Sequence, residues 1–139
     1  MIAALLIEHP SFESLARQTA EHLAQFGVKS EVYLASAFKT PDAVLSIVDD
    51  LNQTEDARVM ICISDQNALP GITAANSVFP VIHLYPGSGN PVFTPDESPA
   101  TIVASPYNAA LCALRMLALT DRKLRKVMAD HINSIREQL

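Results

Sequence analysis

A turn near residue 36 carries side chains suited to binding a small anion. It reads Ser36-Ala37-Phe38-Lys39-Thr40-Pro41-Asp42 and follows a strand-like run over residues 31–35. Two hydroxyls, one ammonium group and a helix start with Asp42 near its cap are groups that can hold a phosphate-sized anion. The residues alone favour a simpler interpretation, in which the turn is a capped helix start and Lys39 lies in water.

A second turn, Glu8-His9-Pro10-Ser11-Phe12, follows the first strand-like run. In α/β folds the first such turn often holds a phosphate on backbone amides, and glycine lets the ligand come close. This turn has no glycine. Glu8 would repel an anion, although His9 and Ser11 could donate hydrogen bonds. An N-cap role explains Ser11 better, so this turn by itself does not predict a phosphate site.

The remaining polar candidates are isolated. Asp65 lies in a third turn, 64–68, and no partner within sequence reach completes an acid–base pair with it. A single acid in a turn is more often a cap or a solvated group. His83 lies within an apolar run and is expected in the core or an interface. His22 and His131 have polar neighbours on helices and are expected to be surface or contact residues.

Strand-like and helix-like segments alternate five times along the chain. Strands are expected at 2–7, 29–35, 58–63, 79–84 and 100–104, and helices at about 12–26, 41–53, 72–78, 106–119 and 121–138. Four of these strands are apolar throughout, which is typical of a parallel sheet covered on both faces. The pattern predicts one domain over residues 1–139, an α/β/α sandwich with a five-stranded, mainly parallel, flavodoxin-like sheet. The three turns would then lie at one edge of the sheet.

The composition of the chain argues against some classes of function. The 139 residues are 49% hydrophobic and 18% charged, with a net charge of −5, which argues against general nucleic-acid binding. No apolar run is long enough to span a membrane. Cys62 and Cys112 lack metal-ligand spacing and are expected to be free thiols in a reducing cytoplasm. No metal or cofactor is expected. The one long loop, 85–98, is rich in proline and glycine and has no assigned role.

The last predicted helix has an apolar stripe that needs a partner. The stripe consists of Leu124, Val127, Met128, His131, Ile132 and Ile135. It can dock on its own domain or on a neighbouring subunit. We expect oligomer contact because the chain is apolar for its size.

Three segments occur in the order of a known family pattern. They are Ser36-Ala37-Phe38-Lys39-Thr40-Pro41, Ala68-Leu69-Pro70-Gly71 with a helix of small residues after it, and Asn108-Ala109-Ala110-Leu111. Together they resemble the AIR carboxylase family of purine biosynthesis, which includes carboxyaminoimidazole ribonucleotide mutase. The resemblance covers nearly the whole chain. It implies a homo-oligomer, an octamer in this family.

The chain departs from that family at residues the resemblance marks as functional. The family pattern after the second strand has an acid–base histidine where this chain has Phe38. The family loop after the third strand has a histidine before Leu-Pro-Gly, where this chain has Ala68. The family's first loop, Gly-Ser-x-Ser-Asp, reads Glu8 to Phe12 here, so His9 replaces the first serine and Phe12 the ribose-binding aspartate. The resemblance therefore implies a family member without the catalytic histidine.

Four residues match the family's ligand-binding positions, and a fifth could assist. Ser11, Ser36, Ala37 and Lys39 carry over, with Lys39 as the cation that contacts phosphate, and His9 is the one histidine on these turns that could carry a proton. The resemblance implies a catalytically impaired protein that binds a phosphorylated ribonucleotide-like ligand. Two alternatives stay open. One is an enzyme of altered chemistry using His9 or Asp65; the other is a ligand-free structural or regulatory subunit that assembles with an active paralogue.

Overall fold

A computed structural model describes all 139 residues and shows a five-stranded sheet in the order β2-β1-β3-β4-β5. Every pair of neighbouring strands is parallel. The strands are β1 (Ile2–Ile7), β2 (Lys29–Leu34), β3 (Arg58–Ile63), β4 (Val81–Leu84) and β5 (Thr101–Val103). The α-helices are α1 (Glu13–Gln25), α2 (Pro41–Asn52), α3 (Ala68–Asn76), α4 (Pro106–Leu117) and α5 (Arg122–Gln138). Two short 3-10 helices, η1 (Pro10–Phe12) and η2 (Ala118–Thr120), precede α1 and follow α4.

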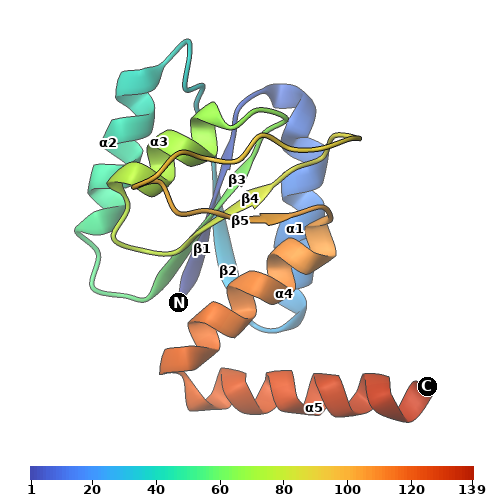
Figure 1. Cartoon of the computed structure of the whole chain (residues 1–139). Coiled ribbons are helices and arrows are strands. Elements are labelled where there is room, and N and C mark those ends of the chain that lie inside the picture. Colours follow the sequence, from blue (N-terminus) through green and yellow to red (C-terminus); the bar gives the residue numbers. More distant parts are fainter.

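Helices cover both faces of the sheet, as Figure 1 shows. α1 and α4 pack on one face and α2 and α3 on the other. Strand order and layering are those of a flavodoxin-like α/β/α sandwich, so the predicted fold class is confirmed. In such a sheet the turns that follow β1, β2 and β3 emerge at the same edge.

Two apolar cores form because successive side chains of a strand point to opposite faces. In β1, Leu5 lies in the core under α1 and α4, whereas Leu6 lies in the core under α2 and α3. In β3, Ile61 and Cys62 divide in the same way. β2 is an edge strand, which explains why Glu31 can be polar and exposed.

The third helix begins earlier than predicted. We expected it over about residues 72–78, opened by Leu69-Pro70-Gly71, but α3 starts at Ala68 and includes these residues. Proline is tolerated there because the backbone N–H groups of a first helical turn have no partner within the helix. The remaining predicted elements differ from the observed ones by at most two residues at each end. The turn that precedes α3 therefore ends earlier than expected.

The last helix is only partly packed on the domain. Asp121 caps α5 by accepting a hydrogen bond from the backbone N–H of Leu124 at 2.8 Å. Leu124 and Met128 are buried in the core. The helix then continues past the body of the protein toward the C-terminus (Figure 1). Ile135, near its end, is exposed. No helix of the chain has the length and apolar character needed to cross a membrane.

Candidate functional site

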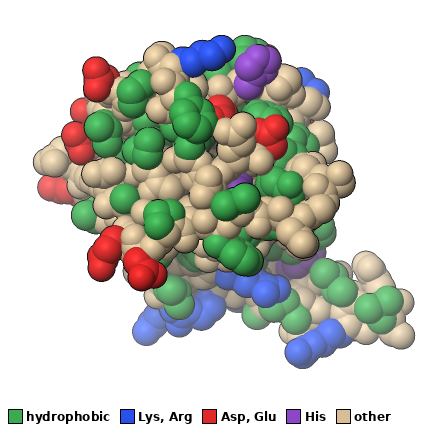
Figure 2. Space-filling view, turned by 45° about the horizontal axis from the view of Figure 1, so that its top comes forward, with side chains coloured by type: hydrophobic (Ala, Val, Ile, Leu, Met, Phe, Trp, Pro, Cys, Tyr) green, Lys and Arg blue, Asp and Glu red, His purple; other side chains and the backbone are tan.

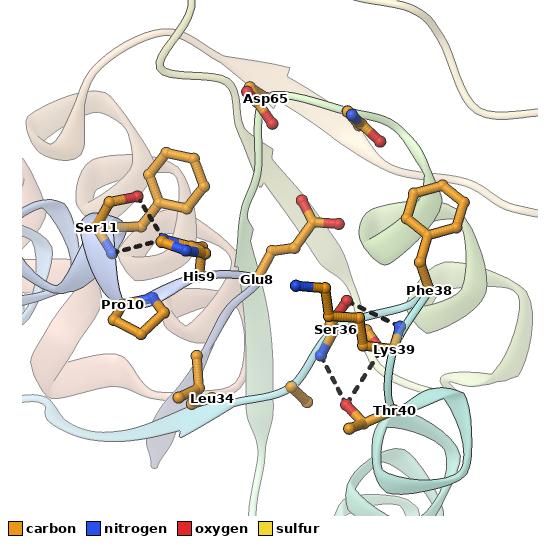
Figure 3. A pocket seen from close by; sticks show the side chains of 13 residues that line it. Glu8, His9, Pro10, Ser11, Leu34, Ser36, Phe38, Lys39, Thr40 and Asp65 are labelled. Atoms are coloured by element: carbon orange, nitrogen blue, oxygen red, sulfur yellow. Dashed lines mark hydrogen bonds between the residues drawn. The ribbon is translucent and has the colours of Figure 1, made fainter.

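The three turns enclose one cavity of about 650 Å³ at the carboxyl edge of the sheet (Figure 3). It is lined by residues 8–12 after β1, 34–36 and 38–40 after β2, and 65–66 after β3. The prediction that these turns meet at one edge is confirmed. The cavity brings together His9, Ser11, Ser36, Lys39 and Asp65, which lie far apart in the sequence.

The turn between β2 and α2 is closed by its own hydrogen bonds. The backbone N–H of Ser36 donates to Thr40 Oγ1 at 2.9 Å, and the backbone N–H of Lys39 donates to Ser36 Oγ at 3.1 Å. Both hydroxyls thus shape the turn. The ammonium group of Lys39 makes no ion pair and points into the cavity (Figure 3). Ala37 is buried and does not line the cavity.

The turn after β1 is capped by its histidine. We expected Ser11 to be the N-cap, which is wrong: His9 Nδ1 accepts a hydrogen bond from the backbone N–H of Ser11 at 3.1 Å. This bond requires an unprotonated Nδ1, so neutral His9 carries its proton on Nε2. The Ser11 hydroxyl, 2.9 Å from the same Nδ1, is then a donor. His9 and Ser11 form one unit at the cavity wall.

A buried hydrogen-bond network lies beneath the cavity and was missed from the sequence. The hydroxyl of Ser64, which is fully buried, donates to the Glu8 carboxylate. The carbonyl oxygen of Ser64 accepts from His83 Nε2 at 2.8 Å. A serine that directly follows an apolar strand was the available sequence signal. Glu8 is thus a fixed group of the site rather than a free surface acid.

His83 lies in the core, as predicted, at 1% exposure. Burial lowers the pKa of the imidazole, and this outweighs the hydrogen bond to the Ser64 carbonyl and the charge of Glu8, which both act in the opposite direction. Its Nδ1 has no hydrogen-bond partner. Burial also raises the pKa of the Cys62 thiol, on the neighbouring strand, to about 12. Cys62 and Cys112 are both free thiols.

An aromatic side chain lies at the rim of the cavity. Phe38 is 69% exposed, although phenylalanine side chains are usually buried in soluble proteins. It stands beside Lys39 on the same turn (Figure 3), and Phe12, at the end of the turn after β1, also lines the cavity. A phenyl ring can contact the face of a planar ligand, but it cannot accept or donate a proton.

The other two histidines lie away from the cavity, in contacts between helices. The ring of His22 in α1 lies 4.9 Å from that of Tyr107 in α4, centre to centre. The Tyr107 hydroxyl lies 3.1 Å from His131 Nε2 in α5. The structure therefore supports a contact role for both histidines. No group of three or more His, Cys, Asp or Glu side chains could hold a metal ion.

Residues 4–138 match the family model described as AIR carboxylase. The chain is 32% identical to a phosphoribosylaminoimidazole carboxylase of Archaeoglobus fulgidus, over 99% of this chain and 81% of that protein. It is 29% identical to an N5-carboxyaminoimidazole ribonucleotide mutase of Methanocaldococcus jannaschii, over 90% of this chain and 84% of the relative. The structure also resembles that of Treponema denticola PurE, with a TM-score of 0.89, 22% identity and coverage of 99% and 92% of the two chains.

Proposed function

Because the chain belongs to the AIR carboxylase family, we propose that its three-turn cavity binds a phosphorylated aminoimidazole ribonucleotide or a similar ligand, with impaired catalysis. The phosphate would bind at Lys39, and the His9–Ser11 unit would supply hydrogen-bond donors to the ligand from the turn after β1. Ser36 holds the backbone of the Lys39 turn. Ala37 is buried and does not line the cavity, so we assign it a packing role in this turn and no contact with the ligand.

The observation that carries this proposal is the unpaired ammonium group of Lys39. It lines the cavity with no ion pair. Phosphate oxygens accept charge-assisted hydrogen bonds, which are shorter and stronger than neutral ones. His9 Nε2, which carries the proton in the neutral ring, supplies a second donor from the turn after β1. The turn after β1 and the turn after β2 can thus both contact the ligand.

The proposed loss of catalysis rests on Phe38. The family pattern has a histidine at this position as proton carrier, and a phenyl ring cannot replace it. General acid–base catalysis typically contributes about 10²–10⁴-fold to rate. Phe12 also replaces the aspartate of the first loop, so the polar contacts of the family are reduced on both sides of the cavity.

A binding experiment tests the proposal. Aminoimidazole ribonucleotide and N5-carboxyaminoimidazole ribonucleotide should raise the melting temperature of the native chain, because a ligand that binds only the folded state stabilises it. Lys39→Ala should abolish the rise. Lys29→Ala is the matched control, since Lys29 is exposed at the start of β2, away from the cavity, and should leave the rise unchanged. A rise that persists in Lys39→Ala contradicts the phosphate assignment.

An altered chemistry on the same substrate class is the second candidate. His9 supports this second candidate. Its Nδ1 accepts hydrogen bonds from Ser11, so in the neutral ring the proton is on Nε2, which can donate it at the cavity. Asp65 also lines the cavity and has no hydrogen-bond partner that would fix it. Turnover in the native chain that is lost in His9→Ala or Asp65→Asn would support this candidate. Absence of turnover in the native chain would exclude it for the substrate assayed.

Assembly belongs to the same proposal. The chain acts as one domain over residues 1–139 and forms a homo-oligomer in the cytoplasm, an octamer by family resemblance. The extension of α5 past the domain, with Ile135 exposed, supports contact with a second subunit. A ligand-free structural or regulatory subunit would show the same assembly but no thermal shift with either ribonucleotide.

A further inference from the structure

Glu8 is held in place by a rigid donor. Ser64 is fully buried, and each of its polar atoms is hydrogen-bonded. Its N–H donates to the Leu84 carbonyl at 3.4 Å, and its carbonyl accepts from His83 Nε2 at 2.8 Å. Its hydroxyl accepts from the backbone N–H of Gln66 at 3.0 Å and donates to Glu8 Oε2. The carboxylate is therefore oriented by contacts that span β1, β3 and β4.

One face of this carboxylate remains available to a ligand. Ser64 is the only partner of Glu8 among the side-chain hydrogen bonds of the chain, and it engages Oε2. Figure 3 shows the Glu8 side chain reaching into the middle of the cavity, between the His9 turn and the Lys39 turn. An ionised carboxylate only accepts hydrogen bonds, at about four lone-pair sites. Glu8 can thus accept a hydrogen bond from a ligand hydroxyl.

Glu8 and Lys39 give the cavity two oppositely charged sides. Both line it, but no ion pair forms between them, and they belong to different turns. A bare anion at Lys39 would be repelled by Glu8. A ligand with a phosphate at one end and a hydroxyl at the other would satisfy both groups. Resting on the phosphate-binding function proposed above, we infer that Glu8, oriented by Ser64, selects hydroxyl-bearing phosphomonoesters such as sugar phosphates.

Calorimetric titration of three probes tests the selection. The probes are inorganic phosphate, butyl phosphate and ribose 5-phosphate, of which only the last carries sugar hydroxyls. The native chain should bind ribose 5-phosphate about tenfold more tightly than butyl phosphate, the effect expected of one hydrogen bond to a charged group. In Glu8→Gln this preference should fall to about twofold or less. Inorganic phosphate should bind Glu8→Gln more tightly than the native chain, because the repelling charge is gone. If Glu8 had only a structural role, Glu8→Gln would not weaken the preference for ribose 5-phosphate and at the same time strengthen the binding of inorganic phosphate.

Two further variants distinguish the effect of the orientation of the Glu8 carboxylate from the effect of its charge. Ser64→Ala keeps the Glu8 charge but removes its donor, so the ribose 5-phosphate preference should fall while phosphate affinity stays as in the native chain. Glu55→Gln removes an exposed carboxylate that does not line the cavity and leaves the Ser64–Glu8 bond, so the preference should remain. Circular dichroism checks that each variant is folded, and Ser64→Ala alone suffices if Glu8→Gln does not fold.

The outcomes also distinguish this inference from the function on which it rests. A preference that survives in Glu8→Gln, or that is also lost in Glu55→Gln, overturns the role of Glu8. Phosphate binding that needs Lys39 but shows no preference for ribose 5-phosphate overturns this inference alone. If none of the three probes binds the native chain, both proposals fail.

Discussion

The imidazole Nε2 of His83 lies 2.8 Å from the carbonyl oxygen of Ser64, and both residues are buried beneath the candidate site. The bond joins β4 to the end of β3, and Ser64 in turn holds Glu8 at the end of β1. Three strands thus meet in one polar network inside an apolar sheet. Because the histidine can be protonated, the network makes the stability of the protein depend on pH.

We expect the protein to lose stability in mild acid through His83. Burial lowers the folded-state pKa of His83 below its ordinary value of 6.5, so below pH 6.5 the unfolded chain binds more protons than the folded one. The stabilising contribution is complete above pH 6.5 and is lost as the pH falls toward the folded-state pKa. Urea unfolding of native protein between pH 8 and pH 5 measures this slope.

The variant that isolates this effect is His83→Gln, which keeps a side-chain donor but cannot titrate. Its free energy of unfolding should depend less on pH between 8 and 5 than that of the native chain. Equal slopes in the two proteins would show that other groups cause the acid sensitivity.

The fold could be predicted from the sequence because the apolar residues within each strand indicate which of its faces are buried. The unbroken apolar runs of β1 and β3 predict a sheet covered on both faces, and the structure divides their side chains between two cores. The start of α3 was misplaced because Pro70 and Gly71 usually signal a turn, although a first helical turn tolerates both.

The candidate site was predictable only in part. The turn at Ser36–Thr40 was a candidate because its residue types can hold an anion, but the residues alone favoured a capped helix start, and the family resemblance was needed to make it a ligand site. The hydrogen bond between Ser64 and Glu8 joins residues 56 positions apart. The sequence around each residue does not indicate which residue it contacts. The capping of η1 by His9 rather than Ser11 depends on a histidine rotamer, which residue preferences for caps do not predict.

The contact between Tyr107 and His131 should stabilise the docking of α5 on α4. Their side chains lie 3.1 Å apart, and few other polar contacts join these helices. Tyr107→Phe should lower the free energy of unfolding by about 0.5–1.5 kcal/mol, the usual net value of one hydrogen bond. Amide hydrogen exchange in α5 should become faster. Tyr33→Phe is the control, because the Tyr33 hydroxyl bonds exposed Glu31 on the edge strand, and its effect should stay within about 0.5 kcal/mol. Equal effects of the two changes would contradict a special role for the α5 contact.

The exposed side of α5 should determine assembly. Ile135 continues the apolar stripe that begins at buried Leu124, but it lies where the helix extends past the domain, and Figure 2 shows hydrophobic side chains on this projecting arm. We expect light scattering of the native chain to give a mass several times 15.1 kDa. Ile135→Asp should reduce it, because a charge in an apolar contact is costly to bury.

Asn133→Asp is the matched control for assembly. Asn133 is exposed and lies about half a turn from the stripe, so the same charge is added on the opposite face of the helix. It should leave the mass unchanged. A native chain that is monomeric at micromolar concentration would overturn the assembly proposal.

Phe38→His should restore part of the missing proton transfer. The ring is 69% exposed at the cavity rim, so an imidazole can replace it without repacking the core, and an ordinary histidine pKa of about 6.5 suits proton transfer near neutral pH. We expect no turnover of N5-carboxyaminoimidazole ribonucleotide by the native chain and measurable turnover by Phe38→His, a partial recovery of the roughly 10²–10⁴-fold effect of an acid–base group. Adding Lys39→Ala should abolish the gain, because the substrate phosphate would lose its cation. If Phe38→His binds the ribonucleotide as the native chain does but remains inactive, the loss of catalysis lies at the other replaced positions, which are Phe12 and Glu8 in the first loop and Ala68 before α3.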